Sequence, residues 1–243
     1  MARLIGPALL WLIGLAILAT LLLYARDYVR KHPQDVPWTP LSLNDPIGRF
    51  TLRKLASLSD DPAHCRSLLA VARSADDPVS PRTISPDCGY ADGMRLDAAR
   101  GEAVFSPAGV AASCPVAAAL VIWERQVLQP AAERHFGQRV ARIDNAGSFS
   151  CRRINGRSEG RFSEHATANA IDITGFGLAD GARISVVEDW PGTGTEALFL
   201  RDVRDGACRL FATILSPEYN AAHADHLHFD QAARGKSGFG VCG

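Results

Sequence analysis

The sequence has no net charge, because its 243 residues include 26 lysines and arginines against 26 aspartates and glutamates. The arginines are scattered among acidic residues and are not gathered into a basic stripe. Nucleic-acid binding needs clustered positive charge, and so does a general attraction to anionic lipid surfaces. The composition therefore argues against a nucleic-acid partner.

The sequence also lacks any Cys-x-x-Cys pair, which argues against a cysteine-based zinc knuckle and a thioredoxin-like redox centre. All cysteines follow the N-terminal apolar run, and an even count in an exported chain indicates disulfides in an oxidising compartment. The six cysteines are Cys65, Cys88, Cys114, Cys151, Cys208 and Cys242. Joining neighbours along the chain predicts the pairs Cys65–Cys88, Cys114–Cys151 and Cys208–Cys242.

No charged residue interrupts the run from Leu4 to Leu23, in which Thr20 is the single polar side chain. At 1.5 Å per residue such a run spans about 30 Å, the thickness of a hydrocarbon core. Tyrosines and basic residues close it, as is typical of a membrane interface: Tyr24, Arg26, Tyr28, Arg30 and Lys31. We predict an uncleaved inner-membrane anchor over residues 1–31. A cleaved signal peptide is the alternative, although the usual Ala-x-Ala exit is poorly matched.

Two further regions follow the anchor. Residues 32–47 hold four prolines and predict an extended tether. Residues 48–243 are long enough for one domain with a sizeable core. Because of the cysteines, we expect this domain to face the periplasm or the cell exterior.

Apolar periodicity predicts an α+β domain, in which helices flank a small antiparallel sheet. Helical patterns, some with start and stop signals, cover residues 48–58, 60–73, 115–136 and 195–215. Strand patterns cover residues 140–143, 170–174, 184–187 and 226–230. Residues 74–113 predict loops and brief strands.

Four of the seven histidines fall in two short segments, residues 163–172 and 223–230. Zinc accepts imidazole nitrogen and carboxylate oxygen, and a catalytic site keeps three protein ligands with one position open for water. Two histidines and one aspartate leave a positive site, which favours acidification of that water. The sequence predicts such a site from His165, Asp172 and a histidine of the second segment.

The spacing within each segment constrains how the chain presents these groups. His226, His228 and Asp230 are two residues apart, so an extended strand places all three on one face. His165 and Asp172 are seven residues apart, which a continuous strand would place on opposite faces. A turn or bulge between them is therefore required if both bind one ion.

The stretch from 148 to 230 resembles the C-terminal domain of bacterial extensin-like proteins, and the resemblance extends over residues 60–243. The matching motifs are Ser-Glu-His165-Ala-x-Ala-Asn-Ala-Ile-Asp172-Ile, Phe-Leu-Arg201, Ala-Cys208 and Tyr-Asn220-Ala-Ala-His223-x-Asp-His226. The plant cell-wall name carries no functional weight, because the chain has no Pro-rich repeats of the kind expected in a structural extensin.

More distantly, the Ser-x-His-x6-Asp motif with a late His-x-His is similar to zinc D-Ala-D-Ala carboxypeptidases and penicillin-insensitive murein endopeptidases. This resemblance implies a zinc D-Ala-D-Ala metallopeptidase-like fold, a Zn²⁺ cofactor and peptidoglycan peptides as substrates. It implies His165, Asp172 and His228 as metal ligands, with His226 or His223 close to the zinc water. The choice between His226 and His228 as the third ligand stays open.

The chain departs from many of these relatives at the general base. They carry a glutamate three residues before the zinc histidine, and His223-Ala-Asp-His226 has none there. The murein endopeptidases, with a histidine instead, are the nearer comparison, because a neutral imidazole can accept a proton from zinc-bound water. The resemblance also implies an upstream arginine that holds substrate or stabilises an oxyanion. Arg152 is the candidate and Arg153 its rival.

These observations predict a membrane-anchored zinc peptidase that cuts peptidoglycan, as a carboxypeptidase or an endopeptidase. The alternative is a non-catalytic cell-wall-binding module of the same fold, which the missing glutamate favours. A third possibility is an envelope protein whose histidines hold an architectural metal.

Overall fold

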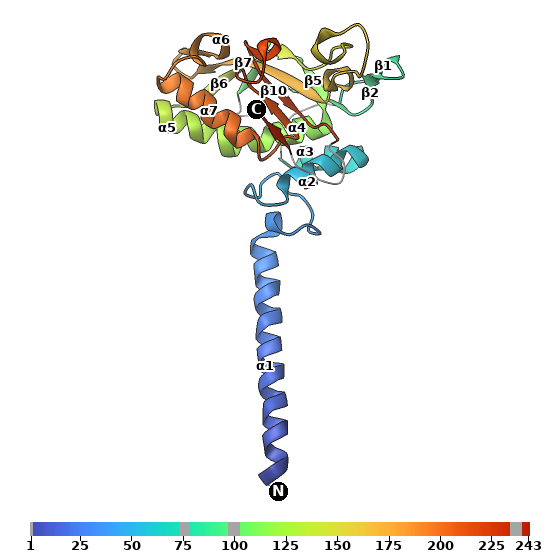
Figure 1. The fold of residues 1–243 in the computed structure, drawn as a ribbon, viewed down its shortest axis with the longest axis vertical. Helices are drawn as coiled ribbons and strands as arrows, with labels where there is room; N and C mark the ends of the chain where they lie inside the picture. Colours follow the sequence, from blue (N-terminus) through green and yellow to red (C-terminus); the bar gives the residue numbers. More distant parts are fainter. Residues whose placement is uncertain (1, 73–77, 97–102, 234–239) are drawn as a thin grey trace.

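The structure is a computed structural model that describes residues 2–72, 78–96, 103–233 and 240–243. Helix α1 (Ala2–Lys31) extends away from the folded part of the chain (Figure 1). Within Gly6–Lys31, an 18-residue window has a mean hydropathy of 2.4, and none of that window is buried. By length and composition this helix is able to cross a membrane, a description that fits both an anchor and a signal sequence.

Residues 32–47 differ from the expected extended tether, because they fold back onto the domain. Val36 and Leu43 are buried. Lys54 Nζ donates hydrogen bonds to the backbone of this segment and to Thr39 Oγ1, both at 2.8 Å. The segment also contains the short 3₁₀ turn η1 (Pro33–Asp35). Proline content indicated an extended chain, but buried apolar side chains and Lys54 hold the segment in place.

The central sheet has seven strands, in the order β11–β9–β10–β7–β6–β4 with β8 paired to β7. The strands are β4 (Val104–Ser106), β6 (Val140–Gly147), β7 (Ala170–Leu178), β8 (Arg183–Ser185), β9 (Thr213–Leu215), β10 (Leu227–Asp230) and β11 (Val241–Cys242). The pairs among β9, β10, β7, β6 and β8 are antiparallel, whereas β4–β6 and β9–β11 are parallel. The centre of the sheet is therefore antiparallel, as predicted, and its two edges are parallel, which was not predicted. Parallel edges need long crossovers, and strand patterns along the sequence do not report pairing direction.

Two short antiparallel ladders lie outside the central sheet. Strand β1 (Arg82–Ser85) pairs with β2 (Cys88–Tyr90), and β3 (Gly93–Arg95) pairs with β5 (Ala111–Ser113). Both lie in the region predicted to hold brief strands.

Helices cover one face of the sheet (Figure 1). The predicted long helix is α4 (Cys114–Trp123), a π-helical turn (Glu124–Leu128) and α5 (Gln129–Phe136) in succession, and it ends at Gly137 with φ 65°. The other helices are α2 (Thr51–Ala56) with the turn η2 (Ser57–Asp60), α3 (Pro62–Ala72), α6 (Val186–Asp189) and α7 (Thr195–Ala207). The chain is thus a mixed α+β structure.

Aromatic side chains join the helices to the sheet. Trp123 of α4 packs edge-on against Phe229 of β10 at 5.3 Å between ring centroids. Phe199 of α7 meets Phe176 of β7 at 5.3 Å. All four rings are buried, and each such ring removes a large apolar area from water. The helices therefore stabilise one face of β7 and β10 and leave the other available.

Two element predictions are wrong in part. The helix expected over 195–215 ends at Ala207, and β9 pairs with β10 instead. The β-branched residues Thr213 and Ile214 of β9 suit a strand, and the pairing of β9 with β10 overrides the helical periodicity of the sequence. The strand expected over 184–187 stops at Ser185, whose Oγ accepts a hydrogen bond from the backbone N–H of Glu188 and caps α6.

Three disulfides link the six cysteines. They are Cys65–Cys114, Cys88–Cys151 and Cys208–Cys242, with Cα–Cα distances of 6.1, 5.7 and 5.6 Å. The third pair is confirmed, and the first two predicted pairs are wrong. The first four cysteines do not pair with their neighbours along the chain. Helix α3 packs on α4, which brings Cys65 to Cys114, and β2 lies beside the loop that begins at Cys151.

Removing the Cys88–Cys151 bond should destabilise the fold. The double variant Cys88→Ser/Cys151→Ser releases a loop with a sequence separation of 63 residues, and opening such a loop costs about 2–5 kcal/mol. Urea unfolding of the full chain in detergent measures the change in unfolding free energy. A difference below about 0.5 kcal/mol between this variant and the wild type would contradict the expectation.

Candidate metal centre

A turn brings His165 and Asp172 to the same side of the chain. His165 lies in the 3₁₀ turn η5 (Glu164–Thr167), where its backbone N–H donates to Ser163 Oγ at 3.2 Å. The turn ends at Ala168, whose backbone is left-handed with φ 55°. A left-handed residue reverses the chain locally, and β7 begins two residues later. The turn required by the seven-residue spacing is confirmed.

Strand pairing brings the third group into place. Strands β7 and β10 are antiparallel, and His228 stands directly opposite Asp172 in their register. Directly paired residues project to the same face of a sheet. The pairing therefore selects His228, from the two histidines that the sequence left open, as the neighbour of Asp172 and His165.

Three potential ligand atoms converge at this point. Asp172 Oδ1 lies 3.1 Å from His165 Nε2 and 2.9 Å from His228 Nδ1, and the two nitrogens are 3.1 Å apart. The three residues expose only 2%, 4% and 7% of their surface, in the order His165, Asp172 and His228. Three buried ligand atoms this close together could hold a metal ion.

The outer nitrogen of each ring has a hydrogen-bond acceptor, which determines where the inner nitrogen's lone pair points. His165 Nδ1 lies 2.6 Å from the carbonyl oxygen of Ser148, and His228 Nε2 lies 3.0 Å from Asp230 Oδ2. A carbonyl and a carboxylate only accept, so these outer nitrogens carry the hydrogens. In the neutral rings the inner nitrogens then point lone pairs at Asp172 Oδ1. Three acceptors about 3 Å apart repel one another unless a cation or a proton lies among them.

The spacing suits zinc. Zinc binds nitrogen and oxygen at about 2.0–2.1 Å in tetrahedral sites, which corresponds to about 3.3 Å between ligand atoms. The observed separations of 2.9–3.1 Å are only slightly shorter. The partners of the outer nitrogens are also those that metal-bound histidines use. The residues present therefore fit a zinc ion.

The pKa values express the same attraction for positive charge. Burial alone would raise the pKa of the Asp172 carboxyl, but hydrogen bonds from His165 and His228, and their charges, hold it well below its usual range. Burial alone would lower the pKa of His228, but hydrogen bonds to Asp172 and Asp230 raise it to about 9. Without a metal ion, the centre thus retains a proton.

His226 and His223 lie beside the three converging residues. His226 Nε2 is 3.5 Å from Asp172 Oδ1, and its Nδ1 is 2.8 Å from Asp225 Oδ1. The His223 ring centroid lies 5.7 Å from that of His228. Burial, and then the positive charge of the two neighbouring histidines, lowers the pKa of His223 to about 4.

Arg152 also reaches the centre, and Arg153 does not. Arg152 donates from a terminal guanidinium nitrogen to Asp172 Oδ2 at 2.9 Å, while almost half of its side chain stays exposed. Arg153 donates instead to the carbonyl of Gly160 and covers the ring of Phe162 at 4.4 Å. The arginine that the resemblance implied is therefore adjacent to the centre as Arg152.

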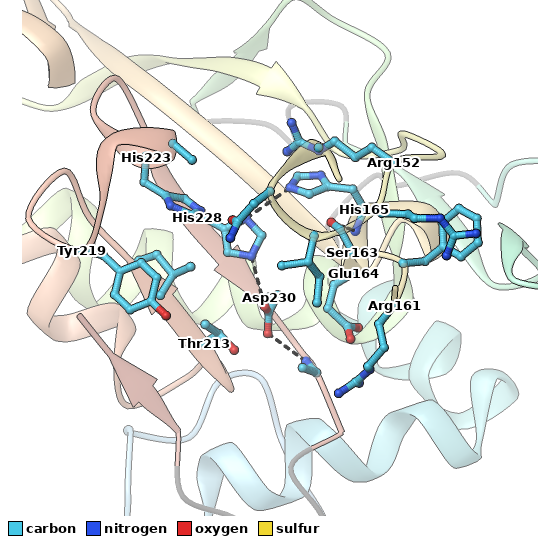
Figure 2. Close-up of a pocket in the computed structure, with 18 of the residues that line it drawn as sticks. Arg152, Arg161, Ser163, Glu164, His165, Thr213, Tyr219, His223, His228 and Asp230 are labelled. Atoms are coloured by element: carbon cyan, nitrogen blue, oxygen red, sulfur yellow. Dashed lines mark hydrogen bonds and ion pairs between the residues drawn. The ribbon is translucent and has the colours of Figure 1, made fainter. Parts of the chain in front are cut away.

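A cavity of about 400 Å³ opens beside the centre (Figure 2). Its lining includes His165, His223, His226, His228 and both arginines. It also includes residues that the sequence did not single out: Arg161, Glu164, Thr213 and Tyr219. Arg161 and Thr213 lie outside the quoted motifs, and Glu164 and Tyr219 lie within them without an assigned role, because strand order and the loop after Cys151 decide which side chains border the cavity. The cavity gives a ligand access to the centre.

A family model described as "Extensin-like protein C-terminus" matches residues 63–243. The chain belongs to this family. The match includes every residue of the candidate centre and all six cysteines, so the extensin-like resemblance is confirmed. No curated protein and no solved structure matches the chain. Membership in the extensin-like family by itself names no activity, and the function has to be argued from the site.

Metal-free protein should lose stability as the pH rises from about 6.5 to about 9. Folding raises the pKa of His228 from 6.5 to about 9, so the folded state keeps a proton that the unfolded chain releases. This contribution is fully present below pH 6.5 and is lost above pH 9. Urea unfolding in the presence of a chelator measures it, with His228→Gln as the variant that cannot titrate. Equal pH dependence of the two proteins over this window would contradict the assignment.

Proposed function

We propose that this extensin-like protein is a zinc-dependent peptidase that acts on peptidoglycan peptides. The observation that carries the proposal is the convergence of His165 Nε2, His228 Nδ1 and Asp172 Oδ1 at 2.9–3.1 Å, with both outer ring nitrogens occupied. A three-ligand centre that borders an open cavity is typical of catalytic rather than structural zinc sites. The similarity to the murein endopeptidases in the Ser-x-His-x6-Asp and His-x-His motifs supports the choice of substrate.

A bound zinc ion would supply an acidified water molecule and polarise the scissile carbonyl. His165, Asp172 and His228 would hold the ion, and Ser148 and Asp230 would orient the two rings. The geometry of these outer partners matters because it fixes which ring nitrogen is free to bind.

We assign the role of proton acceptor to His223, because a pKa of about 4 leaves its ring neutral near pH 7. Its Nδ1 lies 2.8 Å from the side-chain oxygen of Asn220, which accepts, so Nδ1 carries the hydrogen and Nε2 is left with a lone pair. The ring borders the cavity. A positioned imidazole of this kind acts as a general base and takes the place of the missing glutamate. His226, closer to Asp172, is the alternative.

Arg152 provides positive charge at the edge of the centre. Its guanidinium is fixed by Asp172 Oδ2 at 2.9 Å and keeps part of its surface in the cavity. A fixed cation next to the reacting carbonyl stabilises negative charge that develops on oxygen. We assign Arg152 this role, or that of holding a substrate carboxylate.

The compartment agrees with this substrate. Helix α1 is long enough to serve as an inner-membrane anchor, and three disulfides are typical of an oxidising space such as the periplasm. We infer that the domain faces outward, where peptidoglycan lies.

Metal analysis tests the centre directly. The purified full chain should bind one zinc ion, and His165→Ala, Asp172→Ala and His228→Ala should each lose it. His223→Ala should retain zinc, because His223 is not among the three converging residues. Elemental analysis after dialysis gives the stoichiometry. Retention of zinc by all three ligand variants would overturn the assignment.

Digestion of muropeptides tests catalysis. The zinc-loaded wild type should cleave peptide bonds in the muropeptides, and His223→Ala should lower kcat by at least about 100-fold with its zinc content unchanged. Arg152→Ala should lower kcat/KM about 10–1000-fold. Chromatography of the digest, with Arg157→Ala as a matched arginine control, measures both. Peptide binding without cleavage would instead support a non-catalytic cell-wall-binding module.

A further inference from the structure

Most charged groups that border the cavity already have partners. Arg152 is paired with Asp172. Arg153 donates to a backbone carbonyl and stacks on an aromatic ring. Asp230 accepts from His228 through one oxygen and from a backbone N–H, at 2.9 Å, through the other. These groups shape the site, and their charges are largely satisfied within the protein.

Two opposite charges in the cavity are not satisfied in this way. Among the described residues, the Arg161 guanidinium has no hydrogen-bond or ion-pair partner, although it borders the cavity. Glu164 borders it as well and uses only Oε2, which accepts from Asn169 Nδ2 at 2.7 Å. Arg161 and Glu164 form no ion pair with each other. Both come from the segment that leads into His165, and Figure 2 shows them on one side of the cavity.

A cation and an anion that border one side of a cavity without pairing favour a ligand that brings both complementary charges. A ligand with one charge would leave the other protein group unpaired as water is excluded, which costs affinity. An arginine also matches the planar geometry of a carboxylate. The adjacent Glu164 oxygen would accept from an ammonium group on the same ligand.

We propose that Arg161 and Glu164 are specificity-determining residues that bind a substrate side chain ending in both a carboxylate and an ammonium group. The proposal rests on the peptidase function, since it places this zwitterionic end in the same cavity as the metal centre. The substrate class is therefore a peptide that contains a diaminodicarboxylic residue whose second amino-acid group is free. Arg161 binds the carboxylate, and Glu164 binds the ammonium.

Three peptides that differ only in one side-chain end test this assignment. One carries 2,6-diaminopimelate, with both charges; the second carries lysine, with the ammonium only; the third carries 2-aminopimelate, with the carboxylate only. The protein measured is the zinc-loaded full chain carrying His223→Gln, a substitution that keeps the peptides from being cleaved. Affinity is measured by calorimetry in detergent. The first peptide should bind at least about tenfold more tightly than either of the others.

Variants then assign each charge. Arg161→Ala should make the diaminopimelate and lysine peptides bind equally, and Glu164→Gln should do the same for the diaminopimelate and aminopimelate peptides. Arg157→Ala and Glu159→Gln are matched controls, because both residues are exposed in the same loop and do not border the cavity. The controls should keep the full preference.

The outcomes separate the two proposals. Equal affinity of the three peptides for the parent protein, or a preference that survives both substitutions, overturns the role of Arg161 and Glu164. This ranking needs no variant at either position, so it stands even if a substitution disturbs folding. If the wild-type chain cleaves none of the peptides, the peptidase function fails, while the affinity ranking still decides the recognition pair.

Discussion

The carboxylate of Asp172 is the point on which the candidate site depends. Its Oδ1 faces two imidazole nitrogens, and its Oδ2 accepts from Arg152. Because the group is almost fully buried, its charge has to be compensated locally. That requirement explains why three basic side chains from separate segments meet there: one from the turn before β7, one from β10 and one from the loop after Cys151.

The fold meets this requirement by dividing the two faces of the sheet. Trp123 and Phe199 cover one face of β7 and β10, and the polar centre occupies the region beside Asp172 and His228. Charge-bearing networks of this kind contribute little net stability, because desolvation offsets attraction. The aromatic core and the disulfides supply the stability instead. Cys88–Cys151 matters most for the site, since it fixes the chain next to Arg152.

Much of the candidate centre followed from the sequence, because its three converging residues lie in short motifs. The odd spacing of His165 and Asp172 required a turn, and the left-handed Ala168 provides it. The choice of His228 over His226 did not follow, since both fit one strand face and only the register opposite Asp172 separates them. The first two disulfide pairs and the parallel sheet edges were likewise decided by packing between distant segments. Arg161 lies outside the motifs and Glu164 lies within one without an assigned role, so their place in the cavity lining required the fold.

The segment 32–47 shows how local composition misleads when a tertiary contact opposes it. Its prolines favour an extended backbone, but Val36 and Leu43 bury apolar surface, and Lys54 donates to the segment at 2.8 Å. A buried lysine is tolerated only where its donors are satisfied, so Lys54 ties helix α2 to the chain that leaves α1. The domain therefore begins within a few residues of the apolar helix. Any membrane that α1 crosses would lie close to the folded part, and a ligand would have to reach the cavity there without the freedom that a long tether gives.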